Sequence, residues 1–240
     1  MLPMKILALD TALTGCGVCV YDADTGDAQT MRREMGRGQV EHLIPMAQQA
    51  MDKAGVAFAD LDMITTTIGP GAFTGVRIGL SAARGFALSL GKPLIGLTTL
   101  DVLAAQYFEA NKGIKNQCLA VILETKRRDF YFQIFDDNGT AVTDAIACSG
   151  ADIVTALSDY NAQNIICVGD AIERFQGENG DTEYQFIDGF GAIDAAVLAR
   201  LGHNAYMSNA DDFATLPAPL YLRPPDVSQP KRKPRILSAS

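Results

Sequence analysis

Apolar and polar positions follow one another along the chain in an order that predicts the same group of strands twice. In the first half, apolar or alternating runs bounded by turn residues predict three strands, at residues 6–10, 16–21 and 29–34. In the second half, the corresponding runs predict strands at residues 119–124, 129–135 and 141–147. Hairpin turns rich in Asp, Asn and Gly lie at matching places, at residues 22–26 and 136–139. The sequence therefore predicts an internal duplication.

Helical periodicity extends this correspondence beyond the strands. Each group of strands is followed by a helix, a strand and a further helix, the helices lying at residues 39–53, 74–90, 150–160 and 191–206. Two copies of β-β-β-α-β-α form an α/β fold that is duplicated as in the actin, sugar-kinase and heat-shock ATPase (ASKHA) superfamily. A repeat of about 110 residues is a domain duplication rather than a solenoid. The alternative is a pair of unrelated α/β halves.

The duplication divides the chain into three parts. We expect an N-terminal subdomain at residues 1–112, a C-terminal subdomain at residues 113–216 and a tail at residues 217–240. Between the copies, a short strand at residues 94–96 precedes a helix that begins near Thr99. The tail starts with a proline-rich stretch that cannot form a regular helix, so we expect it to lie extended along the surface.

Charge and composition bound the function classes. Of 240 residues, 48% are hydrophobic and 20% are charged, which is an ordinary globular balance. The net charge of −8 repels phosphate backbones, so the chain alone is not expected to grip nucleic acid. A local exception is a basic cluster in the tail, which we interpret as solvated, at Lys231, Arg232, Lys233 and Arg235. No signal-peptide pattern and no apolar stretch long enough for a membrane helix is present, so we expect a cytoplasmic protein that does not bind a membrane.

The cysteines do not indicate a metal or redox site. Five of them are scattered along the chain, which fits a reducing compartment. Cys16 and Cys19 form a C-x-x-C pattern, but they lie on a predicted strand where their side chains point to opposite faces.

A glycine-rich loop joins a predicted strand to the helix at residues 74–90. Its sequence, GPGAFTG at residues 69–75, permits tight turns and close approach of another group. Thr74 could cap the helix, and the free N–H groups of a helix N-terminus suit an anion. The residues alone leave two interpretations open, an anion site and a structural turn.

Several motifs together resemble the TsaB (YeaZ) family over about residues 4–228. They are the strand ILALDT, the GPGAFTG loop with its following VRIGLSAARGFALSLGKPLIGLTTLDVLA, and PLYLRPPDV near the end. The resemblance implies an accessory, non-catalytic subunit for transfer of threonylcarbamoyl to N6 of the adenosine beside the anticodon of tRNA. The implied partners are the catalytic paralogue TsaD and the small P-loop ATPase TsaE, with tRNA contacted only indirectly. Alternatives are an autonomous ASKHA-type small-molecule kinase and a glycoprotease-like peptidase.

Missing ligands separate the chain from its catalytic relative. The resemblance implies an H-x-x-x-H metal motif in the catalytic paralogue, whereas here Met46 follows His42 at that spacing. The other histidine, His203, is far away in sequence, so we expect no metal site. The second hairpin, residues 124–129, also lacks the glycine that phosphate turns use, so we expect no autonomous ATP hydrolysis.

A vestigial phosphate or nucleotide loop remains as a candidate site. It comprises Asp10, Thr11, Gly69, Gly71, Thr74 and Gly75. We expect no nucleotide to bind the chain alone, although ATP or ADP could be closed at a boundary shared with another subunit.

Two helices are predicted to bind the partner. The helix at residues 39–53 carries an apolar stripe, and small residues on the helix at residues 74–90 would let another helix approach. The predicted interface comprises His42, Leu43, Met46, Ala47, Ala50, Gly79, Ala82 and Ala83. We expect a four-helix bundle with a homologous subunit, and a homodimer on the same surface when the partner is absent. The alternative is close packing of these residues inside the monomer.

Overall fold

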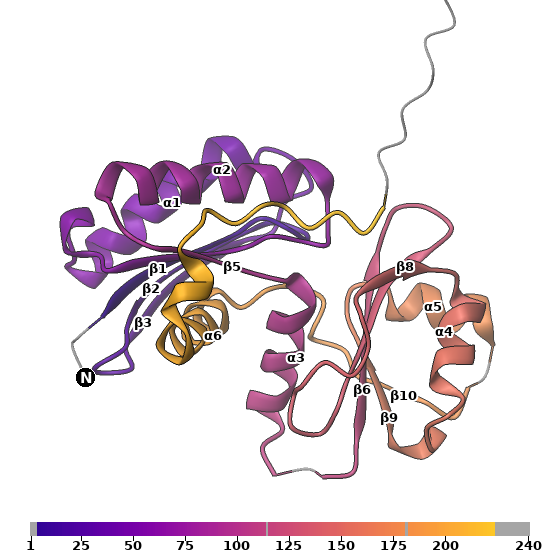
Figure 1. Cartoon of the computed structure of the whole chain (residues 1–240). Helices are drawn as coiled ribbons and strands as arrows, with labels where there is room; N and C mark the ends of the chain where they lie inside the picture. The colour runs from indigo at the N-terminus through magenta and orange to yellow at the C-terminus, as the bar shows by residue number, and fades with distance from the viewer. Residues whose placement is uncertain (1–3, 114, 181, 224–240) are drawn as a thin grey trace, which may run out of the picture.

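The computed structural model describes residues 4–113, 115–180 and 182–223, which form two lobes (Figure 1). Each lobe is built on a five-stranded mixed sheet. The first sheet has the order β3-β2-β1-β4-β5, and the second has the order β10-β9-β6-β7-β8. When the strands of each copy are numbered from the first strand of that copy, both sheets have the order 3-2-1-4-5. The two sheets therefore share one topology. The predicted duplication of one α/β architecture is therefore confirmed.

The first sheet consists of β1 (Lys5–Asp10), β2 (Cys16–Asp22), β3 (Ala28–Arg33), β4 (Met63–Thr67) and β5 (Leu94–Leu97). β1 pairs antiparallel with β2 and parallel with β4. The second sheet consists of β6 (Cys118–Glu124), β7 (Phe130–Phe135), β8 (Ile146–Cys148), β9 (Ile165–Val168) and β10 (Gln185–Phe186). β6 repeats the central position of β1, pairing antiparallel with β7 and parallel with β9.

Six helices accompany these sheets in the described residues. They are α1 (Gln39–Ala54), α2 (Phe73–Leu90), α3 (Thr99–Ala110), α4 (Gly150–Leu157), α5 (Ile172–Asn179) and α6 (Ala195–Ser208). Short 3-10 turns occur at Phe58–Asp60, Ala162–Asn164 and Ala210–Phe213. The helices predicted at residues 39–53 and 74–90 are confirmed to within one residue at each end. No helix in the described part of the chain is long and apolar enough to cross a bilayer.

The second copy departs from the prediction at its third strand. Residues 141–147 were expected to form this strand, but β8 covers only Ile146–Cys148 and Ala141 makes an isolated bridge to Phe135. Side-chain hydrogen bonds supplement a shortened ladder there. The Ile134 N–H donates to the Thr143 hydroxyl and the Gln133 side-chain amide donates to the Thr143 carbonyl, while the Val142 N–H still donates to the Ile134 carbonyl. α5 and β10 were not predicted, since each is too short to show a clear period.

The last helix crosses from one lobe to the other. α6 forms close to its predicted position, yet it packs on β1 and β2 of the first sheet, whereas α3 packs on β6 and β7 of the second (Figure 1). α6 lies so near the first sheet that a Cβ on Gly202 would be 2.4 Å from the Thr65 methyl carbon. The two helices also contact each other, so they join the lobes.

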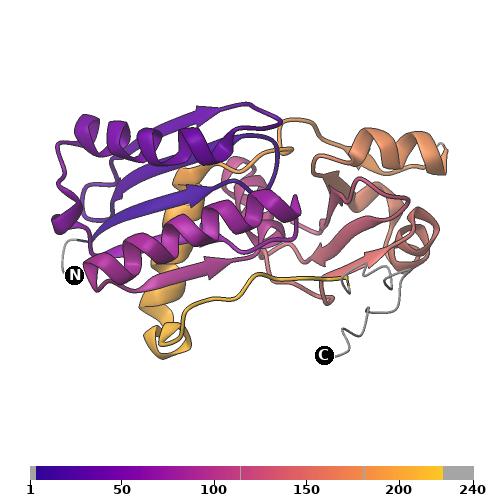
Figure 2. The same ribbon diagram turned by 90° about the horizontal axis from the view of Figure 1, so that it is seen from above.

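The described end of the chain, residues 217–223, lies extended along both lobes, as predicted (Figure 2). On the first lobe, the Leu220 N–H donates to the Ile68 carbonyl over 2.8 Å, and Arg84 donates to the Pro217 carbonyl. On the second lobe, Arg223 forms an ion pair with Asp129. We call residues 217–223 the strap. The basic cluster Lys231–Arg235 lies outside the described residues.

Candidate functional site

A large cleft lies between the lobes and has a volume of about 1320 Å³. The segments that line it are the turn after β1, the loop before α1 with the start of that helix, the N-terminal end of α2, the hairpin between β6 and β7, and the strap, together with Asp170. The turn after β1 and the β6–β7 hairpin are equivalent in the two copies, so the duplication places them opposite each other. This cleft corresponds to the position where the predicted nucleotide loop should act.

Asp10 lies at the end of β1, just before the turn that lines the cleft. Its side chain is 5% exposed, and its Oδ1 accepts hydrogen bonds from the Thr67 hydroxyl at 2.6 Å and the Ala12 N–H at 3.1 Å. Burial raises the pKa of Asp10, against the opposing effect of the Thr67 hydrogen bond. The carboxyl is thus bound to the protein's own donors.

The predicted loop glycines are required by the chain's own backbone. A Cβ on Gly71 would lie 2.3 Å from the Ala12 carbonyl oxygen, and a Cβ on Gly75 would lie 2.1 Å from the Thr11 carbonyl oxygen. The Thr11 hydroxyl also donates to the Gly75 carbonyl over 2.6 Å. Close approach of the turn after β1 to α2 therefore accounts for these glycines without a phosphate.

Gly69 and Thr74 have different roles from those expected. Gly69 has φ +101°, a backbone conformation that favours glycine, and its carbonyl accepts from the Thr99 N–H over 2.8 Å. Thr74 does not cap the helix, because α2 begins one residue earlier, at Phe73, with Ala72 as its N-cap and no side-chain cap bond. The Thr74 side chain is instead exposed at the cleft.

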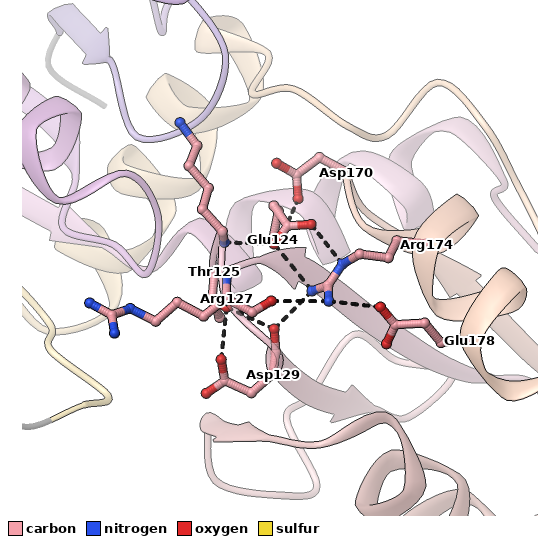
Figure 3. Close-up of polar contacts among 8 residues, drawn as sticks. Glu124, Thr125, Arg127, Asp129, Asp170, Arg174 and Glu178 are labelled. Carbon is pink, nitrogen blue, oxygen red and sulfur yellow. Dashed lines mark hydrogen bonds and ion pairs between the residues drawn. The ribbon is translucent and has the colours of Figure 1, made fainter.

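The second hairpin is held by Arg174 of α5 (Figure 3). The guanidinium donates to both carboxylate oxygens of Glu124, at 2.8 and 3.1 Å, and to the Asp129 carbonyl at 2.8 Å. It also donates to the Arg127 carbonyl at 3.1 Å and packs 3.8 Å from the centre of the Phe130 ring. We call this arrangement the Arg174 clamp. It replaces the flexible turn that a glycine would permit.

Side chains also occupy the backbone donors of this hairpin. The Glu124 N–H donates to Asp170 over 2.8 Å, the Lys126 N–H donates to Glu124 over 2.6 Å, and the Arg127 N–H donates to the Thr125 hydroxyl over 3.1 Å. Burial raises the pKa of Asp170, against the hydrogen bond from the Glu124 amide. A phosphate at this turn would have to displace two carboxylates. The geometry therefore disfavours the kinase alternative.

The predicted partner interface is mostly inside the monomer. Leu43, Met46, Ala47, Ala50 and Ala83 are at most 6% exposed and belong to the core between α1, α2 and the first sheet. The burial of these side chains supports the alternative, in which they pack inside the monomer.

The remaining three predicted interface residues also face inward or lie at an edge. A Cβ on Gly79 would be 2.7 Å from the Thr11 hydroxyl oxygen, so this glycine packs against the turn after β1. His42 is half-buried, with its Nδ1 3.3 Å from the Arg33 guanidinium, and Ala82 is half-buried. A helical period shows that a stripe exists, but it does not show whether the stripe packs on the chain's own sheet or on a partner.

Other apolar side chains occupy the outward faces of the same two helices. Val40 is 65% exposed and Ile44 is 47% exposed on α1, while Phe73 is 57% exposed and Leu88 is 70% exposed on α2. Sequence reasoning did not consider Phe73 and Leu88 as candidates, and it assigned Val40 and Ile44 to the same stripe as the core residues. The signal available was that α1 is apolar over a wider arc than one buried stripe needs.

Neither metal nor protease chemistry is assembled among the described residues. No group of three or more His, Cys, Asp and Glu side chains there could hold a metal ion. His203 is buried on α6, and neither histidine hydrogen-bonds to a described serine or cysteine. The peptidase alternative therefore gains no support from the described geometry.

Asp10→Asn is expected to stabilise the protein more at neutral pH than at acidic pH. Asn retains the oxygen that accepts from Thr67 and Ala12. The pKa of Asp10 is raised from 3.8 in the folded state, so ionisation makes the wild type progressively less stable as pH rises from about 4 through the raised folded pKa. Asn does not ionise. Melting both proteins from pH 4 to 8 should show a gap that widens with pH; a constant or narrowing gap contradicts this.

The TsaD family model, described as tRNA N6-adenosine threonylcarbamoyltransferase, matches residues 33–189, which is more than half of the chain. The chain belongs to this family. The tRNA threonylcarbamoyladenosine biosynthesis protein TsaB of Escherichia coli is 30% identical over 138 residues, which is 57% of this chain and 58% of that protein. The match thus spans less than two thirds of that relative.

Two further similarities concern the fold and part of the sequence. A Pseudomonas aeruginosa protein described as similar to peptidase YeaZ has a TM-score of 0.79 at 24% identity, covering 92% of this chain and all of that one. This likeness shows the fold. The tRNA N6-adenosine threonylcarbamoyltransferase of Erythrobacter litoralis is 46% identical over 65 residues, but these make up only 27% of this chain and 19% of that protein.

Proposed function

We propose that the chain is a non-catalytic subunit that binds a TsaD-type catalytic paralogue and supports transfer of threonylcarbamoyl to N6 of the adenosine beside the anticodon in tRNA. The observation that carries the proposal is the Arg174 clamp in a chain of this family, because it fills the turn that a phosphate would need. The catalytic step then belongs to the paralogue. A TsaE-type ATPase joins the pair, and ATP or ADP binds at an interface between subunits.

The outward faces of α1 and α2 form the proposed partner surface. Four large apolar side chains are exposed there: Val40, Ile44, Phe73 and Leu88. Burial of such side chains contributes favourable free energy in an interface, and a helix pair on one subunit fits the same pair on a paralogue. In the absence of the paralogue, the same faces bring two copies of this chain together. Gly85 lies exposed on α2 with open space around its Cβ position, so a partner helix can approach closely there.

Ile44→Asp and Leu88→Asp are expected to weaken binding to the TsaD-type subunit by roughly 30-fold or more each. A charge at the centre of an interface must be desolvated, and hot-spot residues cost about 2 kcal/mol or more when lost. Both positions are exposed, so the fold and the melting temperature should be retained. Binding can be measured by titration calorimetry with the TsaD-type subunit encoded in the same genome.

Val142→Asp serves as the matched control. Val142 is 47% exposed, as Ile44 is, but it lies in the second lobe away from α1 and α2. The affinity of the Val142→Asp variant for the TsaD-type subunit should equal that of the wild type. Wild-type affinity in both helix variants would place the partner surface elsewhere, and failure of the wild type to bind any TsaD-type subunit would contradict the proposed function.

A further inference from the structure

Positive charge gathers at the cleft although the chain carries a net charge of −8. Five cationic side chains line the cleft: Arg37, Arg77, Lys126, Arg127 and Arg223. They come from the loop before α1, from α2, from the β6–β7 hairpin and from the strap. Cations therefore face the cleft from both lobes.

The carboxylates that line the cleft are already bound within the chain. Glu124 is held by Arg174 through both of its oxygens, and Asp170 accepts from the Glu124 N–H. By contrast, Arg37 and Lys126 form no ion pair with a described residue. The side chain of Arg127 extends away from the Arg174 clamp (Figure 3). The local field at the cleft thus differs in sign from the overall charge.

An exposed aromatic pair lies beside these cations. Phe73 is 57% exposed and Tyr221 is 46% exposed, and their ring centroids are 5.7 Å apart. The Arg77 guanidinium lies 3.7 Å from the Phe73 ring centre and donates to the Tyr221 hydroxyl over 2.8 Å. These contacts hold both rings in place, so a planar ligand that stacks on them would find a preorganised surface.

We propose that the cleft binds a single-stranded segment of RNA, with phosphates on the cations of both lobes and a base on the Phe73–Tyr221 pair. Cations spread across the cleft match successive phosphates better than they match one, and the hairpin amides that would grip a single phosphate are occupied. A duplex keeps its bases stacked on one another, whereas a loop can present unstacked bases. The inference rests on the proposed function, since it identifies the RNA as the loop of the tRNA substrate.

The first test measures the binding of a labelled RNA hairpin, with a loop of anticodon-loop length, to the full chain by fluorescence anisotropy over a range of salt. For single strands, the slope of log K against log salt is about −0.7 per phosphate contact. Replacing both Lys126 and Arg127 by Ala should therefore weaken binding and reduce the slope by about 1.4. The matched control replaces Lys53 and Lys112, which are exposed and do not line the cleft, by Ala. Its slope should equal that of the wild type.

The second test separates stacking from charge. Tyr221→Ala should weaken hairpin binding by roughly 5- to 150-fold, the range expected for loss of one base–aromatic stack. Tyr221→Phe keeps the ring and loses only the hydroxyl bonded to Arg77, so it should bind within a few-fold of the wild type. Melting of both variants shows whether the protein remains folded. Phe73→Ala tests the same stack from α2 and leaves the residues of the strap unchanged.

Several results would overturn the inference. One is that the full chain does not bind the hairpin at about 100 µM, the weak end of non-specific affinity. Another is that the cleft variants and the control variants lose equal affinity. The others are that a blunt duplex binds as tightly as the hairpin, or that ADP displaces the hairpin completely at similar affinity. Loss of binding when the chain ends at residue 223, with wild-type binding by the Lys126 and Arg127 variant, would place the contact in the basic tail instead. Binding of the TsaD-type subunit is read separately, so the proposed function can fail while RNA binding holds, or the reverse.

Discussion

Gly75→Ala is expected to lower the stability of the protein strongly, whereas Gly85→Ala on the same helix raises it. Gly75 faces the turn after β1, where an added Cβ would lie 2.1 Å from the Thr11 carbonyl oxygen. The contact is with backbone, so neither partner can move without disturbing β1 or α2. The same shift would break the 2.6 Å hydrogen bond from the Thr11 hydroxyl to the Gly75 carbonyl.

The expected loss for Gly75→Ala is about 3 kcal/mol, the upper end of ordinary overpacking. In a protein of this size, about 1 kcal/mol corresponds to roughly 2–4 °C in melting temperature, so Tm should fall by about 6–12 °C. Gly85 has open space at its Cβ position and is exposed. Replacing it by Ala removes the entropic cost of a helical glycine and should add about 0.5–1 kcal/mol.

Thermal melting followed by circular dichroism compares the two variants directly. Both replace glycine by alanine in α2, so helix propensity favours both equally and only the surroundings differ. Similar melting temperatures for the two variants would show that the turn after β1 does not press on α2 as described.

Arg174→Met is expected to release the β6–β7 hairpin and to destabilise the second lobe. The guanidinium makes hydrogen bonds to Glu124, to two backbone carbonyls of the hairpin and to Glu178. Methionine keeps much of the apolar stem over Phe130 but makes none of these bonds. Hydrogen bonds to charged groups contribute about 1.5–3 kcal/mol each in favourable cases, and partial exposure of 27% at both Arg174 and Glu124 reduces this by solvent screening. We therefore expect a total loss of about 2–3 kcal/mol.

Hydrogen exchange gives the more specific measurement. The Lys126 amide donates to the Glu124 carboxylate that Arg174 holds, and the Glu124 and Arg127 amides lie in the same hairpin, so all three should exchange faster in Arg174→Met than in the wild type. Arg200→Met is the matched control. Among the described residues, Arg200 forms an ion pair only with Glu109, at side-chain exposures of 34% and 39%, and such a pair contributes at most about 1 kcal/mol. Equal losses in both variants, or unchanged exchange at the hairpin, would contradict the clamp.

The two proposals place a protein partner and RNA on adjoining surfaces. Val40 and Phe73 lie on the outward faces of α1 and α2 and also line the cleft. A TsaD-type subunit on these helices would thus lie beside the RNA at the cleft. The expected phenotypes remain separable, because Leu88 is on the partner surface only and Lys126 is on the cleft only.

The sequence by itself determined the duplicated order of strands, the bounds of α1 and α2, and the absence of the paired-histidine motif. These features depend on periods and spacings within a few residues, where apolar positions report which face of an element is covered. The structure alone decided which residues meet across the fold. It turned the predicted interface stripe of Leu43, Met46 and Ala47 into core, because the first sheet already covers that side of α1. It also brought Arg174 to Glu124 from 50 positions along the chain, and gathered cations from separate segments at one cleft of an acidic protein. Contacts between distant segments depend on how the elements pack together, and a local pattern carries no record of that packing.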